Sequence, residues 1–325
     1  MIKIIKYSKE FKLQWDEFLD ISKNSTFLFK RDFMEYHSYK FEDYSIIIFE
    51  KEKIVGLLPA NIVGKKVLIS HQGLTYGGFV FRKDEKLNNI LKYIYFTLKF
   101  FSEKGIEILK YKSFPRFYNV IGCDEVDYSL FLLGAKLYRR DTAIAISLRN
   151  RIDFQKRRER AIRKAKKLHV RIAEENSFTL FWNEVLTPNL KERFGVNPVH
   201  SLDEINFLGS HFPDNIRQFN AYLNDKIVAG TTIFETTSVA HAQYISSSEE
   251  GRKNGGIDLL FSQLIENVFS DKDYFDFGIC NEEDGKRLNH GLLDWKEGFG
   301  GRAYSHDFYE IGTINYPLLE KVINW

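Results

Sequence analysis

The sequence predicts a mixed α/β protein with mixed sheets, built from two copies of one unit. Two pairs of strand-like segments joined by short charged turns indicate the repeat, one at residues 44–61 and the other at residues 218–234. Each pair is followed, in the same order, by a glycine-containing loop or turn, a helical segment and another strand-like run. A duplication is the economical explanation, with a first copy over residues 1–150 and a second over residues 151–325.

Length and composition indicate packed globular structure throughout. The chain has 325 residues, of which 44% are hydrophobic and only six are proline, so two domains can each bury a core. The first ten residues alternate apolar and polar types like a strand, and no apolar run approaches ~20 residues. We therefore expect a soluble, cytoplasmic monomer or homodimer without a membrane span. Cys123 and Cys280 are solitary, so neither a disulfide framework nor a metal site is predicted.

In the first copy, a glycine-rich loop at residues 70–78 precedes a helix expected near residues 86–104 and a strand at residues 107–111. Glycines let a ligand approach the backbone closely, so we predict a substrate-binding loop. Its candidate residues are His71, Thr75, Tyr76 and Gly77. His71 titrates near neutrality and could accept a proton, although a histidine satisfied by backbone is the alternative.

In the second copy, a basic glycine-rich turn at residues 250–256 joins a strand at residues 240–247 to a helix at residues 256–270, and a strand at residues 274–280 follows. Free N–H groups and the positive dipole end of such a helix bind phosphate oxygens, so the turn predicts a diphosphate cradle. A surface turn that caps an ordinary helix is the alternative. The candidate residues are Arg252, Lys253, Asn254, Gly255 and Gly256.

Neither the dinucleotide-binding G-x-G-x-x-G pattern nor the P-loop pattern occurs in the chain. The strand, turn, helix and strand order, with Arg252, Gly255 and Gly256 in the turn, instead resembles the coenzyme A site of the GNAT acyltransferases. Ile257 departs from that pattern, because a small residue is expected there. The resemblance implies two tandem GNAT-like three-layer units and acyl-coenzyme A as the co-substrate.

The same resemblance implies an opening between two strands. If the strand at residues 240–247 parts from the strand at residues 274–280, its unpaired backbone groups would bind pantetheine and meet the oxyanion. The backbone groups concerned belong to Tyr244, Ile245 and Ser246. Asn281 could hydrogen-bond the pantetheine amide, and a turn-forming or capping role is its alternative. His290, with Asp294 one turn later, is a second candidate base, for which capping and surface pairing are the alternatives.

A strongly basic segment lies near the junction of the two copies. Residues 149–171 hold eleven of the 47 Lys and Arg residues but only two of the 44 acidic ones. The block could neutralise nucleic acid, anionic lipid or nucleotide phosphates. Its apolar residues nevertheless fall on one helical face, which favours a solvated helix with a buried stripe. Those residues are Phe154, Ala161, Ile162, Ala165 and Leu168.

Tandem GNAT-like units with this basic helix resemble the Fem-type peptidyl transferases and related sugar N-acyltransferases. The stretch from Trp295 to Gly301 is similar to the Phe-Lys-x-Gly-Phe-Gly-Gly ending of that group, in which the lysine corresponding to Lys296 is associated with acceptor phosphate. Fem-type enzymes that use aminoacyl-tRNA often carry a long coiled-coil insertion, and no extended heptad pattern occurs here. This departure from the family favours coenzyme A over a stable nucleic-acid partner.

Aromatic and cationic residues gather just after the strand at residues 107–111, a composition suited to a base and its phosphates. Because aromatic residues make up 15% of the chain, chance is the alternative. The candidates are Lys110, Tyr111 and Tyr118. With this aromatic and basic surface, the resemblance implies transfer of an acyl group from acyl-coenzyme A to the amino group of a nucleotide-linked sugar in cell-surface glycan synthesis. The alternatives are Fem-type aminoacyl transfer from charged tRNA to a peptidoglycan precursor and a binding module without catalysis.

Overall fold

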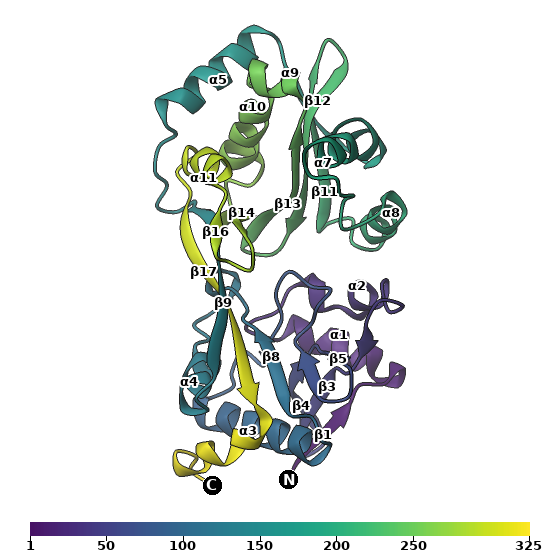
Figure 1. Cartoon of the computed structure of the whole chain (residues 1–325), viewed down its shortest axis with the longest axis vertical. Coiled ribbons are helices and arrows are strands. Elements are labelled where there is room, and N and C mark those ends of the chain that lie inside the picture. Colours follow the sequence, from purple (N-terminus) through teal and green to yellow (C-terminus); the bar gives the residue numbers. More distant parts are fainter. The chain divides into compact units, whose positions relative to one another are not determined.

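A computed structural model describes residues 1–325 and divides them into two compact units (Figure 1). Unit 1 comprises Met1–Asp141 and Ser305–Trp325, and unit 2 comprises Thr142–Tyr304. Strands β9 (Lys136–Ser147) and β17 (Arg302–Gly312) carry the chain across the boundary in the two directions. The division therefore differs from the predicted boundary at residue 150, because the end of β17 pairs antiparallel with β8 (Ile108–Lys112) inside unit 1.

Unit 1 holds a four-stranded sheet and a second group of strands around one core. The sheet has the order β1 (Ile2–Lys6), β3 (Ile46–Glu50), β4 (Lys53–Leu58) and β7 (Val80–Phe81). The second group has the order β17, β8, β6 (Val67–Ile69), β5 (Asn61–Val63) and β2 (Glu42–Asp43). The helices are α1 (Lys12–Asp20), α2 (Arg31–Glu35), α3 (Leu87–Glu103) and α4 (Glu125–Leu132). The apolar face of α3 supplies much of the buried core, as the predicted helix requires.

Unit 2 places helices on both faces of one sheet, which makes the three layers expected of each copy (Figure 1). The strand order is β10 (Arg171–Glu175), β11 (Ile216–Leu223), β12 (Lys226–Glu235), β13 (Val239–Ser247), β14 (Tyr274–Ile279) and β9, beside the small hairpin β15 (Asn281–Glu282) and β16 (Arg287–Leu288). One face carries α5 (Lys156–Lys167), α9 (Glu249–Asn254), α10 (Gly256–Gln263) and α11 (His290–Glu297). The other carries α6 (Thr179–Phe181), α7 (Thr187–Phe194) and α8 (Leu202–His211).

The hairpins β3–β4 and β11–β12 repeat the same local structure. Both turn residues have positive φ in each hairpin, Lys51 and Glu52 in the first and Asn224 and Asp225 in the second. Positive φ at both positions defines the tight turn whose twist matches two antiparallel strands. The strand after each turn also bulges three residues on, in the Lys-Ile-Val segment that the two copies share. The duplication seen in the sequence therefore extends to turn type and bulge position.

Helix α5 has the buried stripe that its sequence favours. Ile162 and Ala165 are buried, and the Phe154 ring lies 5.2 Å from the Phe299 ring, centroid to centroid. Leu168, at the end of the helix, is exposed. No helix of the chain is long and apolar enough to cross a membrane.

Candidate functional site

Strands β13 and β14 of unit 2 part from one another along their length. They pair in parallel only from Val239 with Tyr274 to His241 with Asp276, although β13 continues to Ser247. Beyond this point β14 keeps its antiparallel partner β9, with an irregularity between Asp276 and Ile279. The predicted opening between the two strands is therefore present, and it begins at His241 and Asp276.

Two backbone irregularities coincide with the opening. The pairing of β12 with β13 shifts by one residue at Gln243, and such a bulge bends a strand and re-aims its side chains. Gly278 of β14 has φ +71, a conformation that residues with a Cβ adopt at a cost. The opening therefore follows from local chain geometry on both of its sides.

A buried pair of titratable side chains marks the origin of the opening. Nδ1 of His241 lies 2.8 Å from Oδ2 of Asp276, and Nε2 lies 3.2 Å from Oε1 of Gln243. The other carboxylate oxygen of Asp276 accepts a hydrogen bond from the Gly278 N–H at 2.7 Å. Sequence reasoning missed this pair, because its members are 35 residues apart. The available signal was a titratable residue within each of the two strands.

Lys296 lies beside this pair and is neither an exposed helix lysine nor aimed at solvent. It is buried, and its Nζ donates to the carbonyl oxygens of Gly278 at 2.9 Å and Ile279 at 2.7 Å. Burial lowers the pKa of Lys296 to about 8, while the negative charge of Asp276 acts in the opposite direction. The Fem-like ending thus places a cation at the strand opening, and its assignment to acceptor phosphate stays a prediction.

The predicted phosphate turn has a different local structure. Residues 249–254 form helix α9, capped by Ser248. Gly255, with φ +76, separates α9 from α10, and a Cβ there would lie 2.3 Å from the Ala161 carbonyl oxygen of α5. The glycine therefore permits close packing against α5 rather than an open backbone cradle. Arg252 and Lys253 are exposed. Asn254 is the last residue of α9 and Gly256 the first of α10, so with Gly255 they form the α9–α10 junction.

The remaining residues assigned to the coenzyme A side face two different layers. The Tyr244 hydroxyl accepts the His200 backbone N–H at 3.1 Å, and Ser246 Oγ accepts from Asn189 at 3.0 Å, so both point to the α6–α8 face. Ile245 packs on the core of the opposite face. Their backbone groups, rather than these side chains, remain candidates for pantetheine.

Two further sequence predictions find their side chains engaged elsewhere. The Asn281 oxygen accepts the Thr142 N–H and its nitrogen donates to the Gly285 carbonyl, which favours the structural alternative for Asn281. Asp294 does not orient His290, because Arg157 of α5 binds its carboxylate with both terminal nitrogens. His290 is exposed at the start of α11.

In unit 1, His71 is enclosed rather than presented to a ligand. It is 2% exposed, its ring stacks 5.7 Å from the His37 ring, and its Nδ1 accepts the Gly73 N–H at 3.2 Å. Burial, with a smaller contribution from His37, lowers the pKa of His71 to about 3. A base this weak and this buried is unsuited to accept a proton from an amine, so the geometry corrects the prediction for His71 and favours its structural alternative.

The other predicted substrate residues of unit 1 are mostly internal. Tyr76 bonds Thr26 through its hydroxyl at 2.8 Å, and Tyr118 packs 5.0 Å from the Tyr76 ring. A Cβ on Gly77 would collide with the Ser70 carbonyl. Their packing corrects the proposed base-stacking surface, because buried rings cannot stack on a nucleotide. Of the remainder, Thr75 is exposed, Lys110 is half-buried near the Tyr138 ring and Tyr111 is buried.

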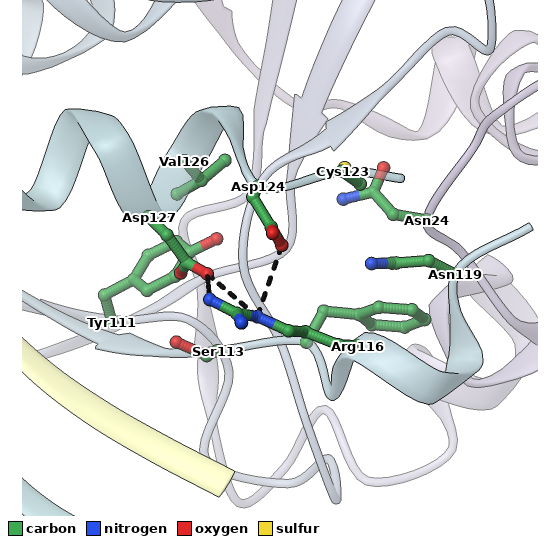
Figure 2. Close-up of a pocket in the computed structure, with 10 residues that line it drawn as sticks. Asn24, Tyr111, Ser113, Arg116, Asn119, Cys123, Asp124, Val126 and Asp127 are labelled. Atoms are coloured by element: carbon green, nitrogen blue, oxygen red, sulfur yellow. Dashed lines mark hydrogen bonds and ion pairs between the residues drawn. The ribbon is translucent and has the colours of Figure 1, made fainter. Parts of the chain in front are cut away.

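Tyr111 nevertheless borders a polar recess in unit 1 (Figure 2). Arg116 forms ion pairs there with Asp124 at 3.2 Å and Asp127 at 2.6 Å. The Ser113 hydroxyl oxygen and the Asn119 amide oxygen are buried without a hydrogen-bond partner in the protein. Buried polar atoms are normally paired, and a recess of this size has room for a water that could donate to these two. The recess is lined by Asn24, Tyr111, Ser113, Phe114, Arg116, Asn119, Cys123, Asp124, Val126 and Asp127.

Solved structures share this architecture over almost the whole chain. The FemX structure superposes with a TM-score of 0.67 at 13% identity and covers 99% of this chain and 100% of its own. L-PGS from Bacillus licheniformis gives 0.60 at 14%, covering 98% of each chain. A tandem GNAT protein from the clavulanic acid biosynthesis pathway gives 0.51 at 10%, covering 96% of this chain and 99% of its own.

No family model matches the sequence, and no curated protein matches it either. The structural likenesses show that the chain has a tandem GNAT-like fold. At these identities they show the fold alone.

Proposed function

We propose that the protein transfers an acyl group from acyl-coenzyme A to the amino group of a nucleotide-linked amino sugar, with the chemistry in unit 2. The observation that carries the proposal is the parting of β13 from β14 after His241 and Asp276. An opening of this kind leaves backbone N–H and C=O groups free to bind an extended amide-containing arm and to stabilise an oxyanion.

The reaction forms one C–N bond and breaks one C–S bond. The neutral amine attacks the thioester carbonyl, loses a proton to a base, and the coenzyme A thiolate leaves and is then protonated. The ammonium group of Lys296 lies beside the opening, where its positive charge can stabilise the negative charge that develops on the thioester oxygen. Positioning of the two reactants supplies the rest of the acceleration.

One observation supports a polar acceptor. The ending from Trp295 to Gly301 resembles that of enzymes that act on nucleotide-linked precursors.

A second candidate function is Fem-type aminoacyl transfer from charged tRNA to a peptidoglycan precursor, and one observation favours it. Helix α5 packs against Gly255, which covers part of the place where a coenzyme A diphosphate was predicted. The same helix exposes a row of cations that a polyanion could neutralise. The row comprises Lys156, Arg160, Arg163, Lys164 and Lys167.

Calorimetry with coenzyme A and acetyl-coenzyme A tests the first function. We expect Arg252→Ala to weaken binding by about 1.5–3 kcal/mol, because it removes a charge-assisted phosphate contact. Lys226→Ala, which removes an exposed cation from the start of β12 in the same unit, is the charge-matched control and should bind normally. Equal affinity in folded wild-type and Arg252→Ala proteins would remove Arg252 from the donor site.

Filter binding of charged tRNA at two salt concentrations tests the second function. Under the first function, tRNA binds weakly and its affinity falls by orders of magnitude between about 50 and 200 mM salt. Specific binding that survives physiological salt, together with aminoacyl transfer, would establish the second function.

A further inference from the structure

The functional assignment leaves open which group takes the proton from the amine. His71 is enclosed and His290 is exposed without an orienting carboxylate. His241, which no sequence pattern identified, occupies the last residue of β13 that pairs with β14. Its side chain retains 11% exposure, and the Asp276 side chain retains 4%. The ring therefore lies at the origin of the strand opening.

Asp276 determines which ring nitrogen of His241 carries the proton. A carboxylate accepts hydrogen bonds and does not donate them, so Nδ1, 2.8 Å from Oδ2, must be the protonated nitrogen. Oδ1 of the same carboxylate is fixed by the Gly278 N–H. The neutral ring then presents an unprotonated Nε2.

The surroundings of Nε2 suit a proton acceptor. Its neighbour in the protein is the Gln243 side-chain amide, 3.2 Å away at the bulge of β13. That amide can turn its NH₂ group toward Nε2 and yield the position to an amine, since the two orientations have the same shape. On the ring edge, Gly278 leaves room that a Cβ, 3.2 Å from Cε1, would fill.

We infer that His241 is the general base of the acyl transfer, with Asp276 as the residue that positions it. The inference rests on the proposed function. As the amine nitrogen forms a covalent bond to the thioester carbonyl carbon, one of its protons passes to Nε2. The resulting imidazolium keeps its hydrogen bond to the Asp276 carboxylate. The C–S bond then breaks, and the coenzyme A thiolate takes that proton, directly or through water, which returns the ring to its neutral form.

Asp276 of β14 contacts this ring directly, and the Lys296 ammonium of α11 interacts with Asp276. Asp276 is therefore the charged group that stabilises the imidazolium formed during the reaction. The carboxylate lies in hydrogen-bond contact with the ring, whereas Lys296 donates to the Gly278 and Ile279 carbonyls. The direct contact is expected to dominate.

The first test reads the tautomer without any substrate. Nitrogen-15 NMR of histidine-labelled full-length protein, with His241→Gln used to assign the signal, should show protonated Nδ1 and unprotonated Nε2 at pH 7.5. In Asp276→Asn, whose amide can donate, the protonated nitrogen should change to Nε2. A ring protonated at Nε2 in the wild type would overturn the inference.

The second test is turnover of acetyl-coenzyme A with a UDP-linked amino sugar. General-base loss costs ~10²–10⁴-fold, so His241→Gln should lower kcat at least tenfold, leave KM for acetyl-coenzyme A within threefold, and flatten the acidic limb of the pH profile. Asp276→Asn should also lower kcat. His211→Gln, at an exposed histidine of α8, is the matched control.

The outcomes separate the inference from the function on which it rests. Wild-type turnover that survives in both folded variants, with the acidic limb unchanged, would overturn the role of His241 alone. A wild type that neither binds nor turns over acetyl-coenzyme A would overturn the proposed function and the catalytic role together. Acetyl-coenzyme A binding by His241→Gln shows that the variant is folded.

Discussion

At the scale of single residues, burial decides which titratable groups can act. His71 and Lys296 are both 2% exposed, yet His71 faces histidine and aromatic rings whereas Lys296 faces two carbonyl oxygens at a strand opening. The sequence around His71, with its glycines and hydroxyl side chains, predicted an accessible loop. Composition cannot show that the loop turns inward, because this depends on residues such as His37 that are distant in sequence.

Enclosure of His71 has a consequence for stability in acid. Its pKa of about 3 in the native protein lies below the ordinary histidine pKa of 6.5. The unfolded state therefore binds more protons below pH 6.5, and native stability falls as the pH falls from 6.5 toward 3. We expect His71→Gln to reduce this slope by on the order of 1 kcal/mol per pH unit. Urea unfolding at pH 6.5, 5.5 and 4.5 measures it, and parallel wild-type and variant curves would contradict the burial argument.

Lys296 predicts a pH dependence of the same sign in an alkaline range. Its native pKa of about 8 lies below the ordinary lysine pKa of 10.5, so between these values the unfolded state binds more protons and native stability rises with pH. Lys296→Met, which keeps much of the side-chain volume, should remove up to about 1.4 kcal/mol per pH unit of that rise. Unfolding free energies at pH 8, 9 and 10 test this. Lys66→Met, at an exposed lysine of unit 1, controls for the loss of a charge.

At the scale of elements, the hairpins were predictable and the α9–α10 junction was not. Two-residue turns between strands leave a local signature, which Glu52 and Asp225 carry. The run from Glu250 to Gly256 has the composition of a turn, and its helical form depends on the cap at Ser248 and on packing against α5. His241 and Asp276 meet only because of the register of β13 and β14, which the sequence does not specify.

The junction can be tested with a matched pair of glycines. Gly195 and Gly255 both end helices of unit 2 with positive φ, but only Gly255 has a backbone atom, the Ala161 carbonyl oxygen, within 2.3 Å of an added Cβ. Gly195→Ala should cost only the left-handed penalty, about 1–2 kcal/mol. Gly255→Ala should cost more, because α5 must also move. Equal losses of unfolding free energy in the two variants, measured by chemical denaturation, would show that α5 does not pack closely against Gly255.

At the scale of the whole molecule, the duplicated α/β architecture could be predicted because each copy repeats one order of strands and helices. The return of residues 305–325 to unit 1 could not be predicted, since it depends on the long-range pairing of β17 with β8. Fold likeness at 8–14% identity shows the fold and not the acyl donor, so the chemistry has to be measured.

The most direct measurement of the central claim is coenzyme A release from acetyl-coenzyme A by the wild-type chain, followed with a thiol reagent in the presence and absence of UDP-linked amino sugars. The account predicts release that requires the amino sugar, matched by a product whose mass has increased by one acetyl group. Coenzyme A release at the same rate with and without the amino sugar would contradict the account. So would a folded protein that releases no coenzyme A and instead transfers an amino acid from charged tRNA.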